Sequence, residues 1–284
     1  MRRGEAEAPG AATVINAIAT LKGSAFAVDL YTSAEVVVGG DGGVTGEIED
    51  KPDADTSLIE RCAELVLERF DVDDGAHVTT SSDVPMASGL KSSSAAANAT
   101  VLATLDAIGE SEGFDRREAT RIGVEAARDA GVTITGAIDD AAASMLGGVV
   151  LTDNSEDEII RREEANWDVA VYVPDETAKS ADTDVERSRL VGSVVDRAFE
   201  VARDGEYADA MTINGLAYSA ALGFDPSVAV DALEHVDGAG LSGTGPSYAA
   251  IGDRQDIKEV VKEWEKHPGT VLEVETDNDG ARVV

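Results

Sequence analysis

The chain has 284 residues, of which 43% are apolar, so it can bury a core and is too apolar for an intrinsically disordered protein. Its 56 acidic residues outnumber 23 basic ones and leave a net charge of −33, which argues against nucleic acid or an anionic membrane as a partner. No run of about 18 uncharged apolar residues occurs, so the sequence predicts no transmembrane helix.

The acidic residues are spread along the chain rather than gathered in one tail, and they recur in residues 50–60, 154–164 and 175–186. Self-repulsion on this scale requires screening, and the Debye length falls to about 3 Å only near about 1 M salt. We therefore expect an adaptation to the salt-rich cytoplasm of a halophilic archaeon. The segment Met1–Glu5 turns acidic at once and lacks the apolar stretch of a secretory signal, which also favours the cytoplasm.

The first segment is predicted to be rich in strands. Residues 13–39 are largely apolar and β-branched with partial alternation, and residues 39–43, GGDGG, are typical of a turn. Residues 44–49 are expected to return as the hairpin partner of the strand before the turn.

A helix is expected over about residues 56–70, where Ser57 and Glu60 have the spacing of a capping box. The single cysteine, Cys62, follows the apolar period of this helix, so we interpret it as a small core residue rather than a reactive thiol. Residues 75–82 are then expected to form a strand that leads into the next motif.

Residues 84–102, VPMASGLKSSSAAANATVL, carry the strongest local motif. Gly89 permits a close approach of the backbone to a ligand, and the serines at 92–94 supply hydroxyl groups. A helix that ends at Gly109 is expected to follow, and the amides of its first turn lack intrahelical acceptors. These features favour a phosphate-binding loop, with an ordinary Ser-rich helix cap as the alternative. The Walker pattern G-x-x-x-x-G-K-[ST] is not met.

Further elements follow along the chain. Asp115 and Glu118 mark the start of a helix that ends at Gly131, and Pro226 opens a later helix. The remaining predictions are helices over 185–203, 206–221 and 257–267, strands over 147–154, 167–174 and 270–276, and a Gly-rich turn into a strand over 241–252.

The predicted strands and helices gather in clusters instead of alternating regularly, which favours an α+β fold over a doubly wound parallel sheet. The acidic residues 153–166 are a candidate boundary. We therefore expect two domains, one over residues 1–155 and one over residues 156–284.

Three motifs in one order make the chain similar to the GHMP kinases, the superfamily of galactokinase, homoserine kinase and mevalonate kinase. They are GLKSSSAAANA (residues 89–99), TITGAIDDAAASMLGGVV (133–150) and LSGTGPSYAAI (241–251). Together with NAIATLKGSAFAVDL (16–30), they most resemble the archaeal shikimate kinase family. The resemblance implies a GHMP kinase fold, with an N-terminal domain like ribosomal protein S5 domain 2 and a ferredoxin-like C-terminal domain.

The resemblance also implies that ATP, arriving with Mg²⁺, phosphorylates the 3-hydroxyl of shikimate. The residues implied to wrap the triphosphate are Pro85, Met86, Ala87, Ser88, Gly89, Leu90, Lys91, Ser92, Ser93, Ser94 and Ala95. Ser93 aligns with a serine that contacts the magnesium ion in relatives. Lys91 stands where most relatives have glycine, and it could neutralise phosphate charge, reach the anionic substrate or only face solvent.

Asp139 falls where relatives with a catalytic aspartate read G-x-D-N or G-x-D-Q. A carboxylate there could accept the proton of the attacking hydroxyl, or it could only orient that hydroxyl or cap the next helix. Asp140 is the weaker candidate, because adjacent side chains point to different sides of a regular element.

The third motif is implied to pack beside the phosphate loop through Gly243, Thr244 and Gly245, and a flexible turn is the alternative. It departs from the usual string of glycines at Pro246 and Ser247, which puts individual contacts in doubt.

Asn16, Lys22 and Asp29 are polar residues in an apolar stretch and are candidates for binding the substrate. Lys22 could bind the carboxylate of shikimate and Asp29 could accept from a hydroxyl. The two could equally form an internal pair that holds strands together.

Two other hypotheses stay open. The chain could act on another small alcohol, homoserine first and mevalonate second, or it could bind nucleotide without catalysis. The three histidines, His77, His235 and His267, are widely spaced, so a structural zinc site or a His-based triad is not expected. The sequence leaves the oligomeric state open.

Overall fold

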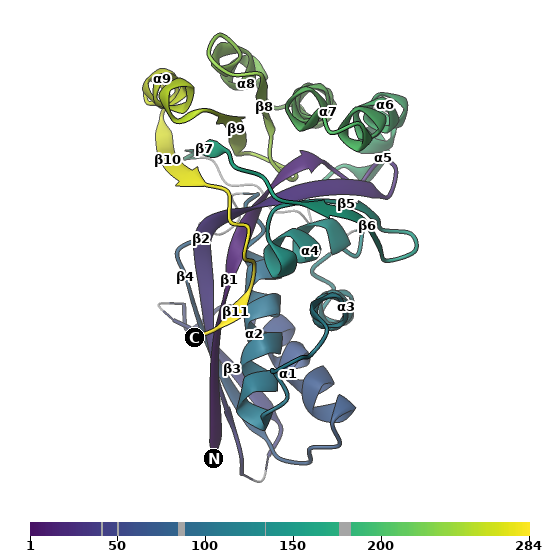
Figure 1. Cartoon of the computed structure of the whole chain (residues 1–284), viewed down its shortest axis with the longest axis vertical. Helices are drawn as coiled ribbons and strands as arrows, with labels where there is room; N and C mark the ends of the chain where they lie inside the picture. The colour runs from purple at the N-terminus through teal and green to yellow at the C-terminus, as the bar shows by residue number, and fades with distance from the viewer. Residues whose placement is uncertain (41, 50, 85–88, 134, 176–182) are drawn as a thin grey trace.

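The computed structural model describes residues 1–284 except 41, 50, 85–88, 134 and 176–182. The described strands form a seven-stranded and a four-stranded sheet (Figure 1). The larger sheet has the order β11-β1-β2-β4-β3, with β5 paired to β2 and β6 to β5. Its strands are β1 (Arg2–Ile15), β2 (Lys22–Val38), β3 (Val44–Ile48), β4 (Ala76–Ser82), β5 (Val149–Asp153), β6 (Glu158–Glu163) and β11 (Arg282–Val283).

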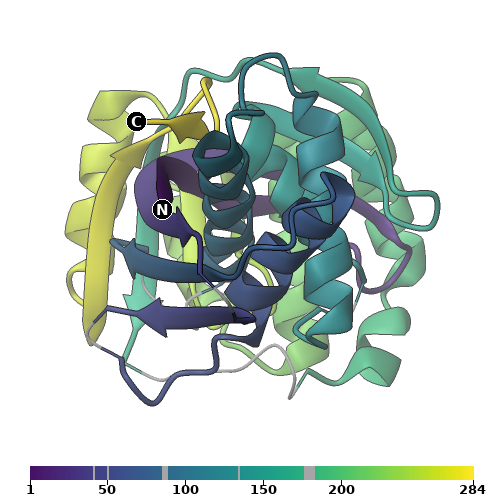
Figure 2. The same cartoon turned by 90° about the horizontal axis from the view of Figure 1, so that it is seen from below.

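Helices α1, α2 and α3 lie together on one side of the long strands (Figure 1 and Figure 2). With α4, their bounds are α1 (Ser57–Arg69), α2 (Ser92–Ile108), α3 (Arg116–Asp129) and α4 (Ile138–Leu146). The predicted helices that end at Gly109 and Gly131 are confirmed, and α4 was not predicted as an element.

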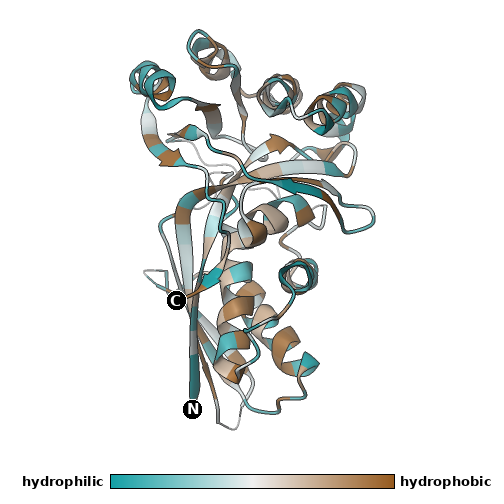
Figure 3. Ribbon diagram, viewed as in Figure 1, coloured by the Kyte–Doolittle hydropathy of each residue, from teal (hydrophilic) through white to brown (hydrophobic). Residues whose placement is uncertain are grey.

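Helix α2 is the central helix of this half of the molecule, and it is hydrophobic along most of its length (Figure 3). Ala95, Ala99 and Ala103 are fully buried, and such small side chains allow β1 and β2 to pack closely against the helix. The alanine run after the serines therefore serves packing, whereas the start of β1, next to the N-terminus, is hydrophilic (Figure 3).

The predicted hairpin of residues 44–49 is wrong. Strand β3 pairs in parallel with β4, and β4 lies between β3 and β2. Ala76, Val78 and Thr80 of β4 are buried, whereas no residue of β3 is, so burial favours β4 for the inner position. Helix α1 makes the crossover that a parallel pair requires.

The predicted capping box of α1 is also wrong. Thr56 is the N-cap residue and makes no side-chain hydrogen bond to the backbone. The Glu60 carboxylate instead accepts from the Gly46 amide and the Thr56 hydroxyl, both at 2.8 Å, which joins α1 to β3. The cap of α3 is confirmed, because the Asp115 side chain accepts from the amides of Arg117 and Glu118.

The smaller sheet has the order β10-β7-β9-β8, and helices lie over it in a row at the top of Figure 1. Its strands are β7 (Asp168–Pro174), β8 (Gly238–Leu241), β9 (Tyr248–Gly252) and β10 (Gly269–Glu275). The helices are α5 (Val185–Arg189), α6 (Gly192–Arg203), α7 (Tyr207–Leu222), α8 (Ser227–Ala232) and α9 (Arg254–Trp264), so the predicted helix over 185–203 is interrupted between α5 and α6.

One hydrophobic cluster joins the two sheets, because Val14 and Phe26 of the larger sheet share it with Val171 and Ile251 of the smaller sheet. The clustered strands and helices confirm the α+β class. A boundary after residue 155 would fall inside the β5–β6 hairpin, where Asp153 pairs with Glu158. The division into two domains stays a prediction.

The last residues of the chain return to the larger sheet. Strand β11 pairs with β1, and the Val284 amide donates to the Glu5 carbonyl at 3.1 Å. The Ala281 amide donates to the carbonyl of Met145 near the end of α4, also at 3.1 Å. Among the described helices, none has the length and apolarity needed to cross a membrane.

Candidate active site

A cavity of about 290 Å³ lies where the first turns of α2 and α4 meet the β1–β2 and β8–β9 turns. It brings together residues from all three motifs. The predicted site residues that line it are Asn16, Gly89, Leu90, Lys91, Ser92, Ser93, Ser94, Asp139, Gly243 and Thr244. Ala95 and Gly245 do not line it, and Pro85, Met86, Ala87 and Ser88 lie outside the described residues.

The start of α2 presents backbone amides to the cavity. Gly89 and Lys91 both have positive φ, 79° and 61°, and the helix begins directly afterwards at Ser92 without a side-chain cap. The first amides of such a helix have no intrahelical acceptor and carry the positive end of its dipole. This geometry can hold an anionic group such as a phosphate.

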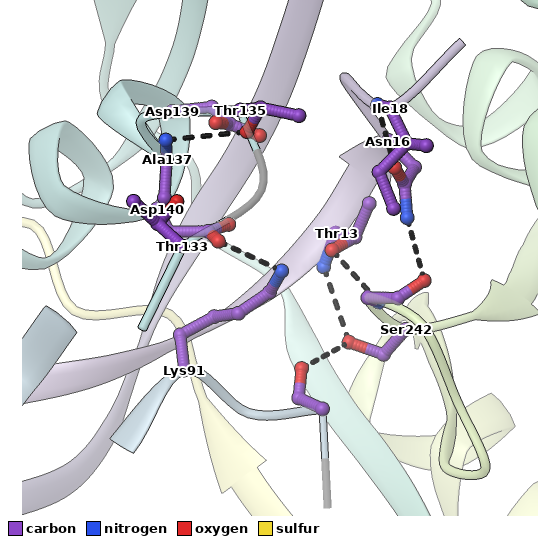
Figure 4. Close-up of polar contacts among 12 residues, drawn as sticks. Thr13, Asn16, Ile18, Lys91, Thr133, Thr135, Ala137, Asp139, Asp140 and Ser242 are labelled. Carbon is purple, nitrogen blue, oxygen red and sulfur yellow. Dashed lines mark hydrogen bonds and ion pairs between the residues drawn. The ribbon is translucent and has the colours of Figure 1, made fainter. Parts of the chain in front are cut away.

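The third motif holds the loop before α2 in place. The Ser242 hydroxyl donates to the Gly89 carbonyl at 3.0 Å and accepts from the Thr13 amide at 3.3 Å. A Cβ atom at residue 89 would collide with the carbonyl oxygen of Ser242, so only glycine permits this close approach. Next to it, the Gly243 amide donates to the Thr13 hydroxyl at 2.9 Å (Figure 4).

Asn16 joins the β1–β2 turn to the third motif. Its Nδ2 donates to the Gly243 carbonyl at 2.7 Å (Figure 4). Its backbone amide donates to Oδ1 of Asn214 at 3.1 Å. From the same helix, α7, the Tyr218 hydroxyl donates to the Asn16 carbonyl at 3.1 Å and accepts from the Ala19 amide at 3.0 Å. Helix α7 therefore fixes the conformation of this turn.

Asp139 and Asp140 lie in the first turn of α4, and both line the cavity. The Asp139 side chain is 4% exposed, and its Oδ1 accepts from Nδ2 of Asn154 at 2.8 Å. Burial, and then the charge of Asp140, raise the pKa of Asp139 to about 7. A carboxyl group with such a pKa can take up a proton at neutral pH.

Asp140 pairs with Lys91 at the N-cap of α2. Its Oδ2 lies 2.9 Å from Nζ of Lys91, and the two side chains are 12% and 16% exposed (Figure 4). The expectation that adjacent acids point to different sides, with only one of them at the site, is wrong, because both Asp139 and Asp140 line the cavity, although each has its own partner. Of the roles left open for Lys91, a purely solvent-facing one is wrong.

Lys22 and Asp29 do not line the cavity. Nζ of Lys22 lies 3.2 Å from the Asp196 carboxylate and 5.7 Å from the centre of the Phe199 ring. Asp29 accepts from the Glu275 amide at 2.7 Å, which joins β2 to β10. Each has its own partner, so they do not form the internal pair.

Sequence reasoning missed Asn154, Asn214 and Tyr218. Asn214 and Tyr218 lie about 200 residues from the group that each contacts, Asn154 lies 15 residues from Asp139, and none of the three belongs to a motif. Asn214 is a buried polar residue inside a helix, and that is the one local signal that could have identified it.

Within the described residues, no group of three His, Cys, Asp or Glu side chains could hold a metal ion. Magnesium that arrives with a nucleotide needs only one or two protein oxygens, because phosphate and water complete its shell. Two groups at the cavity are suitable donors. One is the hydroxyl of Ser93, which is exposed, and the other is the carboxylate of Asp140, whose Oδ1 is buried and has no hydrogen-bond partner among the described residues. The residues present therefore fit a magnesium ion.

Comparisons with known proteins show the family to which the chain belongs. Residues 57–148 match the model of the GHMP kinases N terminal domain. A shikimate kinase of Halobacterium salinarum is 55% identical over 280 residues, covering 98% of this chain and 99% of that protein. A shikimate kinase of Methanosarcina acetivorans is 52% identical over 282 residues, covering 98% and 95%.

Solved structures of other enzymes share the fold. The homoserine kinase of Cytophaga hutchinsonii superimposes with a TM-score of 0.80 at 17% identity, covering 100% of this chain and 98% of that one. The mevalonate kinase of Methanococcus jannaschii gives a TM-score of 0.77 at 15% identity, covering 96% and 98%. At such identities the likeness concerns the fold alone.

Proposed function

The chain belongs to the shikimate kinases of the GHMP kinase superfamily, and from this premise we propose that it transfers the γ-phosphoryl group of ATP to the 3-hydroxyl of shikimate. The products are 3-phosphoshikimate and ADP, in the pathway to chorismate and the aromatic amino acids. The observation that carries the proposal is the cavity in which the first turn of α2, Lys91 and Asp139 converge.

The triphosphate of ATP binds against the first turn of α2, where the amides of Ser92, Ser93 and Ser94 face an anion without competing acceptors. Ser93 with a carboxylate at the start of α4 would hold the magnesium ion that arrives with ATP, and this ion would neutralise phosphate charge. Lys91 adds a further positive charge beside the phosphates.

Asp139 receives the proton of the shikimate hydroxyl as that oxygen bonds to the γ-phosphorus and the bond from phosphorus to the ADP oxygen breaks. Its hydrogen bond from Asn154 fixes one carboxylate oxygen, so the other is available to the substrate. Asn16, at the opposite wall of the cavity, is the candidate for orienting shikimate. Lys22 and Asp29 lie outside the cavity and are therefore less favoured as substrate-binding residues.

The test is an assay of ADP release in high KCl with shikimate, homoserine and mevalonate as separate acceptors. We expect turnover with shikimate and little with the other two. Activity on homoserine without activity on shikimate would contradict the proposal. ATP binding without turnover on any acceptor would instead indicate a catalytically silent nucleotide-binding protein.

The role of Asp139 is tested separately by Asp139→Asn. Loss of a general base typically costs about 10²–10⁴ in rate, so kcat should fall by at least about 100-fold. A kcat within about a factor of two of the wild-type value would refute the base role. We also propose that the protein works in a salt-rich cytoplasm, on the basis of its net charge of −33.

A further inference from the structure

Lys91 occupies a backbone conformation that suits glycine. At the N-cap of α2 it has φ 61° and ψ 35°, in the left-handed region that L-residues disfavour. A glycine at this place would adopt the same conformation without strain. A strained residue at a ligand site is a reason to ask what its side chain does there.

The side chain of Lys91 crosses the cavity to Asp140. Nζ lies 2.9 Å from Oδ2, and both groups are largely buried. Nζ also lies 3.2 Å from the place that a Cβ atom would take on Gly243, so the ammonium stands between α4 and the third motif. The second oxygen of Asp140, Oδ1, is buried and has no hydrogen-bond partner in the described part of the chain.

This pair is a poor candidate for stabilising the fold. Removing two charges from water costs about as much as their attraction returns, so partly buried ion pairs are often neutral for stability. The carboxylate has one of its oxygens unpaired, and the loop backbone is strained. The pair does, however, keep an ammonium in the cavity that Ser92 and Ser93 of the first turn of α2 also line.

We propose that Asp140 is a positioning residue. Its carboxylate holds the Lys91 ammonium in the cavity until the phosphates of the nucleotide replace the carboxylate as the counter-ion of that ammonium. The exchange deepens the proposed function and rests on it. A triphosphate carries several negative charges against one on the carboxylate, so it competes successfully for a single ammonium on a flexible stem. No covalent bond changes in this step.

The exchange predicts opposite effects of the two partners on ATP binding, measured by calorimetry without shikimate and without metal. Asp140→Asn removes the competitor and should tighten binding about five- to tenfold, whereas Lys91→Met should weaken it about tenfold. In the double variant the effect of Asp140→Asn should shrink below about twofold, because no ammonium remains to be released. Glu259→Gln, which removes the acid paired with Lys262 on the surface of α9, is the matched control and should change nothing.

Three outcomes would overturn the proposal. Equal tightening by Asp140→Asn in the wild-type chain and in the Lys91→Met variant would mean that Asp140 only repels the triphosphate. Weaker binding of ATP to Asp140→Asn in the absence of magnesium would mean that the carboxylate does not compete for the ammonium. Wild-type affinity in Lys91→Met would show that the ammonium does not meet the phosphates.

A second set of variants separates the side chain from the backbone strain. Lys91→Gly should melt at a higher temperature than Lys91→Met, yet bind ATP equally weakly, because only glycine relieves the strain. Lys91→Arg should restore most of the affinity. If Lys91→Gly bound ATP as tightly as the wild-type chain, the strained conformation of Lys91 would have no role in ATP binding. Turnover of shikimate by the wild-type chain is measured independently, so a wrong substrate would leave these binding results interpretable.

Discussion

Asp139 is a carboxyl group in surroundings that penalise its charge. Burial and the neighbouring carboxylate of Asp140 favour its protonated form, while Lys91 and the hydrogen bond from Asn154 favour the charged form. The first two effects prevail and raise the pKa of Asp139 from an ordinary value near 3.8 to about 7. Charge at this residue therefore opposes folding.

This shift predicts how stability depends on pH. The folded chain keeps the Asp139 proton up to about pH 7, whereas the unfolded chain loses it near pH 3.8. The contribution of the protonated Asp139 to the free energy of unfolding is therefore full below pH 3.8 and is lost as the pH rises through about 7. Asp139→Asn removes this dependence. Thermal melts at constant high salt should show a difference in Tm, variant minus wild type, that grows between these pH values and then levels off. A difference that shrinks with rising pH would contradict the shift.

Gly23 on β2 has no side chain, and the Asp139 carboxyl group occupies the space that a Cβ atom would need. A Cβ atom on Gly23 would lie 2.6 Å from Cγ and Oδ2 of Asp139, so Gly23→Ala must displace the carboxylate. A misplacement of about 1 Å can cost about 100-fold in rate, and we expect a loss of kcat on that order with little change in Tm. Ser24→Ala, the next residue and on the other face of the strand, is the control and should keep its kcat. A Gly23→Ala enzyme with unchanged kcat would disprove the constraint.

At the scale of the elements, α7 acts on the site from outside it. Asn214 and Tyr218 both hydrogen-bond to the backbone of the β1–β2 turn, and Asn16 of that turn in turn holds the third motif. A substitution on α7 should therefore affect a cavity that its own side chains do not line.

We expect Asn214→Ala and Tyr218→Phe each to lower the free energy of unfolding by about 1–3 kcal/mol, because each leaves a buried backbone group unpaired. The double variant should cost less than the sum, since the two side chains hold one turn. Denaturant unfolding at high salt measures all three. Strictly additive effects would show that the two contacts are independent.

Much of this arrangement could be predicted from the sequence, because its signals are local. The Gly89–Ser94 motif, the Asp115 cap and the small residues of α2 are each encoded by neighbouring residues. The β3–β4 pairing could not be predicted, since it depends on which strand buries more surface beside β2. The contacts of Asn16 with α7 span about 200 residues of sequence, and no local pattern indicates them.

At the scale of the whole molecule, charge is the dominant property. A net charge of −33 on 284 residues makes the compact state repel itself, while screening by salt relieves that repulsion. Ion pairs such as Arg61 with Glu64, Glu68 and Asp129 offset only part of the negative charge.

Stability and activity should both rise with KCl between about 0.1 M and 1 M, over which the Debye length falls from about 10 Å to about 3 Å. Circular dichroism melts and ADP release across that range measure the two effects. A chain that stays fully folded and active without added salt would contradict the salt adaptation.

The return of the last residues to the first sheet also determines when the enzyme can become active during its synthesis. Residues 277–284 hydrogen-bond to β1, to β2 and to both ends of the α4–β5 connection, where Met145 and Gly148 lie. A ribosome makes residues 277–284 after β1 and α4, so the β11 partner of β1 and the support behind α4 are missing until this segment has emerged. The α4 carboxylates therefore gain their final setting only after residues 277–284 have left the exit tunnel, and a nascent chain stalled before that point should yield no competent kinase.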